Sequence, residues 1–175
     1  VFGLVGSEMC IRDRSSSSAE YYRSSNWELS AQSYSQLMEL KCDQWNSDWV
    51  NVDDVYLYWS IALQNLGKFE ESEDVLTKGL DELPENTTLM TRLAYAYKKQ
   101  GKIDEMIIEY ERLMDSGSDD TDSLRDLANA YGKQGRVDEQ ISVLKKILNI
   151  DPNNSSVQSE FCLLYTSPSP RDRIR

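Results

Sequence analysis

LGKFEES (residues 66–72), QGKIDEM (residues 100–106) and QGRVDEQ (residues 134–140) are three versions of one short pattern in this chain. Each version has a glycine followed by a basic residue, an apolar residue and two acidic residues. The glycines stand 34 residues apart, at Gly67, Gly101 and Gly135. A repeat of this period predicts a fold built by stacking one small unit several times.

Each unit has the pattern of two helices joined by a tight turn. Apolar or small residues occupy positions 4, 7, 8, 10 and 11 of each unit, a spacing typical of one helix face. In the second full unit these residues are Met90, Leu93, Ala94, Ala96 and Tyr97. The glycine at position 15 ends this helix, and acidic residues then begin a second one. A single helical hairpin cannot bury its apolar face, so the units must stack into an all-α array.

The chain resembles the tetratricopeptide repeat family, a 34-residue helix–turn–helix with small residues at positions 8 and 20, tyrosine at 11 and proline at 32. Three full units match, at residues 53–86, 87–120 and 121–154. We expect a partial repeat over residues 19–44, a linker at 45–52 and a truncated repeat from 155. The resemblance implies a right-handed solenoid whose first helices line a concave groove. We expect the linker segment WNSDWVN (residues 45–51) to pack locally, with an aromatic docking surface as the alternative.

The two ends of the chain share one DNA sequence. Residues 4–13 (LVGSEMCIRD) can be back-translated as CTC GTG GGC TCG GAG ATG TGT ATA AGA GAC. The reverse complement, read one frame over, encodes LLYTSPSPR, the sequence of residues 163–171. The string resembles a transposon-derived adaptor used in preparing sequencing libraries. We therefore expect residues 1–14 and 161–175 to be adaptor-derived and residues 15–160 to be a native fragment, rather than a chain with a Pro-rich docking tail.

Composition excludes several classes of partner. Residues 15–160 hold 14 basic and 27 acidic residues, a net charge of −13. Such a charge argues against binding to nucleic acid or to anionic membranes. No apolar run approaches the roughly 20 residues that a membrane-spanning helix needs. Residues 15–160 contain a single cysteine, Cys42, which we expect to be packed or incidental rather than reactive. With residues 1–14 assigned to the adaptor, the sequence indicates no cellular compartment.

Nothing in the chain points to catalysis. It has no histidine, and no phosphate-binding loop, metal-spaced cysteine pair or nucleophile elbow occurs. We therefore predict that the fragment is not an enzyme and needs no cofactor or metal. The acidic loop DSGSDDTD (residues 115–122) invites a calcium site, but its position between two helices favours capping. The NTT at residues 86–88 is expected to be a turn between repeats, with glycosylation as the alternative.

The surface left for binding is the exposed face of the first helices, at positions 2, 5, 6, 9, 12 and 13, Gln64 among them. This set carries five basic and three acidic residues, whereas the second helices carry most of the acids. We therefore predict a groove for a protein or peptide, with some preference for acidic residues. Tyrosines would supply apolar contact and a polar tip. The predicted groove residues are Tyr58, Asn65, Arg92, Tyr95, Lys99, Arg125, Asn129 and Lys133.

Some members of the family hold a chaperone's C-terminal carboxylate with basic and amide side chains. Asp122 and Asp126 occupy positions where that clamp needs cations, so this role is not expected. The sequence favours a protein-binding scaffold or adaptor. The alternatives are a regulatory or positioning arm of a larger enzyme and a structural part of an envelope or secretion assembly, because fold alone does not separate them.

Overall fold

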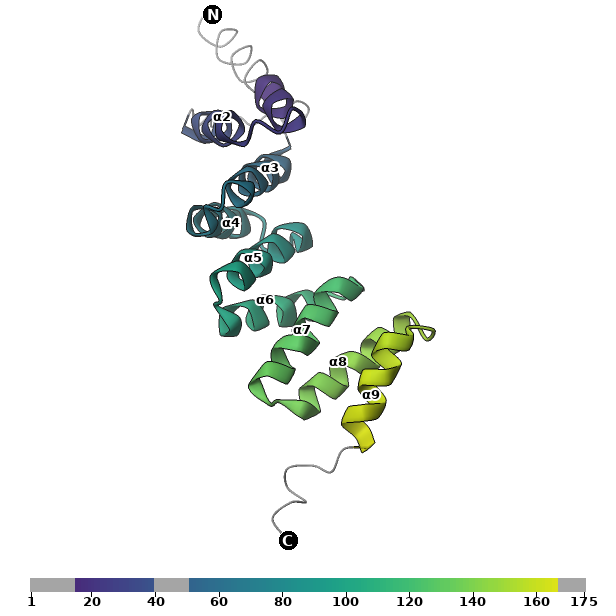
Figure 1. The fold of residues 1–175 in the computed structure, drawn as a ribbon. Helices are drawn as coiled ribbons and strands as arrows, with labels where there is room; N and C mark the ends of the chain where they lie inside the picture. Colours follow the sequence, from purple (N-terminus) through teal and green to yellow (C-terminus); the bar gives the residue numbers. More distant parts are fainter. Residues whose placement is uncertain (1–14, 40–50, 167–175) are drawn as a thin grey trace, which may run out of the picture. The chain divides into compact units, whose positions relative to one another are not determined.

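The computed structural model describes residues 15–39 and 51–166, and all regular secondary structure within these ranges is helical (Figure 1). The expected all-α class is therefore confirmed. The chain divides into two compact units, Val1–Lys102 and Ile103–Arg175. This boundary falls inside the repeat expected at residues 87–120.

The first unit begins with a helix over residues 15–23. It continues with α2 (Trp27–Glu39), α3 (Val52–Asn65), α4 (Phe69–Glu82) and α5 (Thr87–Gln100). Successive helices from α2 to α5 pack on one another, and α3 also contacts α5. α3 and α4 thus form the hairpin expected at residues 53–86, with α2 stacked before it and α5 after it.

The second unit contains α6 (Ile103–Asp115), α7 (Thr121–Gln134), α8 (Val137–Ile150) and α9 (Ser155–Thr166). α7 and α8 form the hairpin expected at residues 121–154, α6 packs on α7, and α9 packs on α8. α9 continues to Thr166, six residues past the expected native end at Glu160. Its buried residue is Val157, whereas Leu163 and Tyr165 are each 71% exposed.

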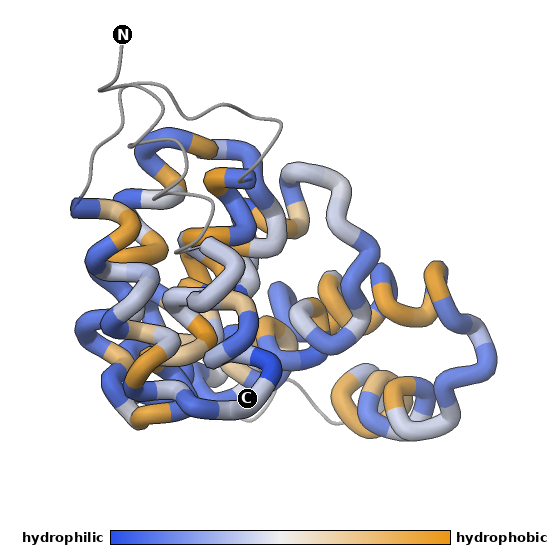
Figure 2. Tube along the Cα trace, turned by 90° about the horizontal axis from the view of Figure 1, so that it is seen from above, coloured by the Kyte–Doolittle hydropathy of each residue, from blue (hydrophilic) through white to orange (hydrophobic). Residues whose placement is uncertain are grey.

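The apolar stripe predicted for the first helices forms the core of each unit. In α5, Met90, Leu93, Ala94 and Ala96 are buried and Tyr97 is half-buried. In α7, the five stripe residues are all buried: Leu124, Leu127, Ala128, Ala130 and Tyr131. No helix in the described ranges is long and apolar enough to cross a membrane, and Figure 2 shows hydrophilic residues interrupting the hydrophobic ones along the helices.

The recurring glycine makes the turn after each of the first helices α3, α5 and α7. Gly67, Gly101 and Gly135 have φ of 76°, 77° and 71°, the left-handed region that side chains disfavour. The helix after the turn starts without a side-chain cap in α4 and α8. Its first turn instead holds an ion pair, Lys68–Glu71 at 3.2 Å in α4 and Arg136–Glu139 at 3.0 Å in α8.

The first helices α5 and α7 begin differently, on capping side chains, whereas Asn51 before α3 makes no side-chain cap hydrogen bond. Asn86 Oδ1 accepts hydrogen bonds from the backbone N–H groups of Thr88 and Leu89, both at 3.1 Å. Asp120 accepts in the same way from Asp122 and Ser123 at the start of α7. The capping interpretation of the acidic loop is thus confirmed. The NTT segment is the start of α5 rather than a turn, because Asn86 caps the helix and Thr87 and Thr88 belong to it.

Three predictions fall on residues outside the described ranges. These are the local packing of segment 45–51, the environment of Cys42, and the adaptor origin of residues 1–14. The adaptor origin of residues 167–175 also falls outside the described ranges.

Gly79 in α4 allows an unusually close approach between helices. A Cβ at this position would lie 2.9 Å from Tyr56 Cγ and 3.1 Å from Leu89 Cδ1. Both side chains are buried, so neither has room to move away. The ring of Tyr56 therefore packs directly on the backbone of α4, and its hydroxyl donates to Glu82 Oε1 at 2.9 Å.

We expect Gly79→Ala to lower the free energy of unfolding by about 1 kcal/mol, because overpacking costs more than the gain in helix propensity returns. Gly132→Ala in α7 is the matched control. There the atoms nearest to the new Cβ are at the flexible end of the Gln140 side chain, at 3.0 to 3.2 Å, so the loss of stability should be smaller. Urea unfolding followed by circular dichroism measures both. An equal change in the two variants would show that Gly79 is not a packing constraint.

Tyr34 makes the stability of the first unit fall as the pH becomes alkaline. It is 4% exposed and packs with Leu37 and Val55. Burial raises its pKa to about 12, with further upward contributions from Tyr58, Tyr22 and Asp54. Since its pKa in the folded state lies above the unfolded value of 10.0, the protonated hydroxyl stabilises the fold fully below pH 10. This contribution is lost as the pH rises toward 12.

Tyr34→Phe should therefore reduce the loss of stability between pH 10 and pH 12 relative to the wild type. Urea midpoints at closely spaced pH values give the comparison. Tyr21→Phe, which removes a half-exposed hydroxyl from the same unit, is the control and should keep the wild-type profile. Superimposable profiles for Tyr34→Phe and the wild type would contradict the assignment.

Candidate functional site

The eight predicted groove residues all keep accessible side chains in the structure. Their spacing of three, four, seven or eight places them on one face of each helix. Three helices carry them, two in the first unit and one in the second. α3 carries Tyr58 and Asn65, α5 carries Arg92, Tyr95 and Lys99, and α7 carries Arg125, Asn129 and Lys133.

Two of the predicted residues on α5 are in contact. The Lys99 ammonium lies 5.3 Å from the centroid of the Tyr95 ring, within the range of a cation–π interaction. Arg92, one turn before Tyr95, is half-buried. α5 has no acidic residue along its length, although the chain as a whole carries −11. This helix therefore presents a local positive surface with an aromatic side chain at its centre.

Tyr58 on α3 belongs to an aromatic group that was only partly predicted. Its ring lies 4.7 Å from that of Tyr22, and Tyr22 in turn meets Trp27 edge-on at 5.5 Å. Tyr22 lies on the helix over residues 15–23 and is also half-buried. Sequence reasoning missed it because only the end of that first helix was recognised, without a full repeat to set its register.

The amides at the end of α3 behave differently from each other. Asn65 is exposed, and its Nδ2 donates to the Ile61 carbonyl at 2.8 Å. Gln64, predicted to face the groove, is instead buried. Its Nε2 donates to Ser72 Oγ at 3.1 Å and to the Arg92 carbonyl at 3.2 Å, so it ties α3 to α4 and α5. The prediction for Gln64 was wrong because hydrogen bonds to both neighbouring helices hold its amide in the interior instead of leaving it on the exposed face.

In the second unit, Arg125 is held by a neighbouring helix. Its Nη2 donates to Ser156 Oγ in α9 at 2.7 Å, whereas Asn129 and Lys133 are exposed. Asp126 accepts a hydrogen bond from the Tyr110 hydroxyl at 3.2 Å. Burial, followed by the charge of Asp126, raises the pKa of Tyr110. Asp126 therefore has a structural partner inside the unit.

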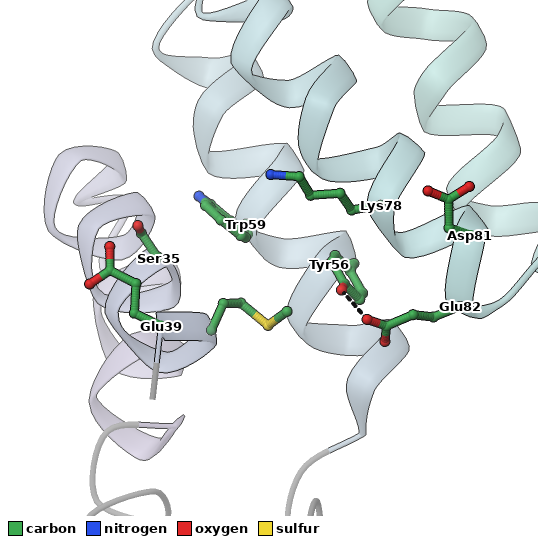
Figure 3. A pocket seen from close by; sticks show the side chains of 8 residues that line it. Ser35, Glu39, Tyr56, Trp59, Lys78, Asp81 and Glu82 are labelled. Carbon is green, nitrogen blue, oxygen red and sulfur yellow. Dashed lines mark hydrogen bonds between the residues drawn. The ribbon is translucent and has the colours of Figure 1, made fainter. Parts of the chain in front are cut away.

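A cavity of about 660 Å³ between α2, α3 and α4 was not predicted from the sequence. Tyr56 and Trp59 of α3 lie between acidic residues of the two flanking helices, Glu39 on α2 and Asp81 and Glu82 on α4 (Figure 3). Ser35, Met38 and Lys78 complete the lining. The available signal was Trp59 at a core position where Leu93 and Leu127 stand in the next repeats, but one large residue does not predict a cavity.

The described residues offer no candidate metal centre. Within residues 15–39 and 51–166, no three acidic or cysteine side chains are grouped so that they could hold an ion. This includes the acidic loop before α7, where Asp120 caps the helix.

Comparison with known families gives a match in the second half of the chain. Residues 87–116 and 123–154 match the tetratricopeptide repeat family. These segments cover α5 with α6, and most of α7 with α8. No curated protein sequence matches the chain.

Solved structures with the same fold are more numerous. MamA residues 41 to the end from Desulfovibrio magneticus RS-1 match with a TM-score of 0.71 and 16% identity, over 88% of this chain and 82% of that one. MamA AMB-1 matches with a TM-score of 0.70 and 20% identity, over 90% of this chain and 82% of that one. A tetratricopeptide repeat protein from Parabacteroides merdae matches with a TM-score of 0.77 and 14% identity, over 88% of this chain and 58% of that one.

These likenesses establish the fold, an all-α solenoid of helix–turn–helix units. The match to the tetratricopeptide repeat itself covers residues 87–116 and 123–154.

Proposed function

We propose that the chain is a protein-binding scaffold or adaptor whose first helices hold a peptide that contains acidic residues. The tetratricopeptide match supports a role in protein interaction in general. The observation that carries the finer proposal is the surface of α5, where Arg92, Tyr95 and Lys99 share one face of a helix without acidic residues. We call these three residues the α5 stripe.

The charge of the α5 stripe contrasts with its surroundings. The neighbouring helix α4 contains six acidic residues and one lysine in its sequence FEESEDVLTKGLDE. An acidic peptide approaching this unit is therefore repelled by α4 and attracted by α5. Such an arrangement fixes the position and direction of a ligand more than it raises the affinity.

Tyrosine adds the contact that charge alone does not provide. The half-buried rings of Tyr95 and Tyr58 present apolar surface and a hydroxyl that can donate to a peptide carbonyl. Tyr58 is supported from behind by Tyr22, so its ring needs little ordering on binding. In the second unit, α7 presents a comparable set of hydrogen-bond donors, which are Arg125, Asn129 and Lys133.

The proposal is tested by selecting peptides from a random dodecapeptide library on the folded protein. We expect the selected sequences to be enriched in Asp and Glu. One selected peptide, labelled with fluorescein, is then titrated and its anisotropy followed. Arg92→Glu with Lys99→Glu should weaken binding at least tenfold, because two attractive charges become repulsive. Helical content should stay unchanged.

Lys68→Glu is the control for a general change in charge. It lies in the turn between α3 and α4, where it pairs only with Glu71 at the surface, and should leave affinity within twofold of the wild type. Binding should also weaken between 50 and 500 mM salt, since exposed charges are screened. Retained affinity in the double variant, or selection of basic peptides, would refute the α5 stripe as the binding surface.

A further inference from the structure

The cavity between α2, α3 and α4 has the size of a ligand site. Pockets for small groups enclose about 300–1,000 Å³, and this one measures about 660 Å³. None of its lining residues belongs to the α5 stripe or to the other predicted groove positions. A ligand here would therefore use a second surface of the first unit.

The walls of the cavity carry more negative than positive charge. Glu39, Asp81 and Glu82 contribute three carboxylates, and Lys78 contributes one ammonium. Within the described residues, no ion-pair or hydrogen-bond partner is found for Glu39 or Asp81. Both side chains are exposed, so they can bind an incoming cation without losing an internal contact.

The floor between these carboxylates is aromatic and firmly held. Trp59 packs against the buried residues Tyr34, Leu37 and Val55. Tyr56 is 2% exposed, and its hydroxyl donates to Glu82, which orients that carboxylate. An indole face beside carboxylates is a favourable setting for a flat cation, because the ring attracts positive charge and the oxygens accept its N–H groups.

We propose that this cavity binds the guanidinium group of an arginine side chain presented by a basic segment of a partner protein. The guanidinium is planar, so it stacks on Trp59 while its N–H groups reach Asp81 or Glu39. A lysine ammonium is more strongly hydrated and lacks the flat face, and it should bind less well. An acidic peptide is excluded by the same carboxylates, so this ligand differs in charge from that proposed for α5.

Lys78 provides an internal test of this assignment. Its side chain comes from α4 and lines the same cavity as the three carboxylates (Figure 3). A resident ammonium competes with an incoming cation for these acids. Removing its charge should therefore strengthen binding of arginine, whereas removing the charge of Asp81 should weaken it.

The probe is N-acetyl-arginine amide, titrated into the whole chain at low salt. Binding is followed by the NMR signal of the Trp59 indole N–H, which Trp59→Phe identifies among the four tryptophans. We expect a saturable shift with a Kd on the order of 1 mM, the usual range for a ligand of this size. N-acetyl-citrulline amide, which has the same shape without the charge, should bind at least tenfold more weakly.

The variants separate the cavity from general electrostatics. Asp81→Asn and Glu39→Gln should each raise Kd at least fivefold, and Lys78→Gln should lower it at least twofold. Asp74→Asn is the matched control, since it removes the same charge from an exposed position of α4 that does not line the cavity. The Arg92→Glu and Lys99→Glu pair should leave Kd within twofold, which separates this site from the α5 stripe.

Three outcomes would overturn the proposal. The first is a shift that does not saturate up to 20 mM (about twenty times the Kd expected from ligand size). The second is equal binding of the citrulline compound, and the third is an equal effect of Asp81→Asn and Asp74→Asn. Unchanged circular dichroism in every variant ensures that a loss reflects the site rather than the fold.

Discussion

A hairpin of two short helices has too little surface of its own to bury, and this constraint underlies the whole structure. In the first unit, the stripe of α3 is covered on one side by α2 and on the other by α4 and α5. The contact of Tyr56 with Gly79 shows how close this packing is, because the ring lies where a Cβ would otherwise stand. Each hairpin is therefore stable through its neighbours, as expected of a repeat array.

Stacking also requires that polar groups between helices find partners. Buried tyrosines meet this need by donating to carboxylates on an adjacent helix, as Tyr56 does to Glu82 and Tyr110 to Asp126. Tyr131 donates to Glu111 in the same manner. Burial and the nearby carboxylates raise the pKa of all three tyrosines. Part of the acidic surface is thus used to satisfy polar groups of the core.

Most of the fold could be predicted from the sequence because the same pattern of turn and core residues recurs in each repeat. A glycine at a fixed position gives the turn, and Asn86 and Asp120 give the caps, by local chemistry that does not depend on the rest of the chain. The division between α5 and α6 was not predicted. It cuts through one repeat, so no feature with the period of the repeat marks it.

The candidate sites were predictable to a smaller degree, because they depend on contacts between repeats. Helix periodicity correctly placed Tyr95 and Lys99 on an accessible face, since that depends on one helix alone. It failed for Gln64, whose partners Ser72 and Arg92 lie on two other helices. The cavity beside Trp59 was missed for the same reason, because its walls come from α2 and α4 as well as α3.

The separation of charge in the first unit has a consequence for selectivity. α5 presents cations and no acid, whereas the cavity joins three carboxylates to one lysine. A partner that fits one surface is repelled by the other, so a wrong docking mode is disfavoured by unpaired like charges. A partner that carries an acidic segment and a separate arginine would meet both requirements. One that carries only net charge would match neither proposed site in full, because each also contains an aromatic ring.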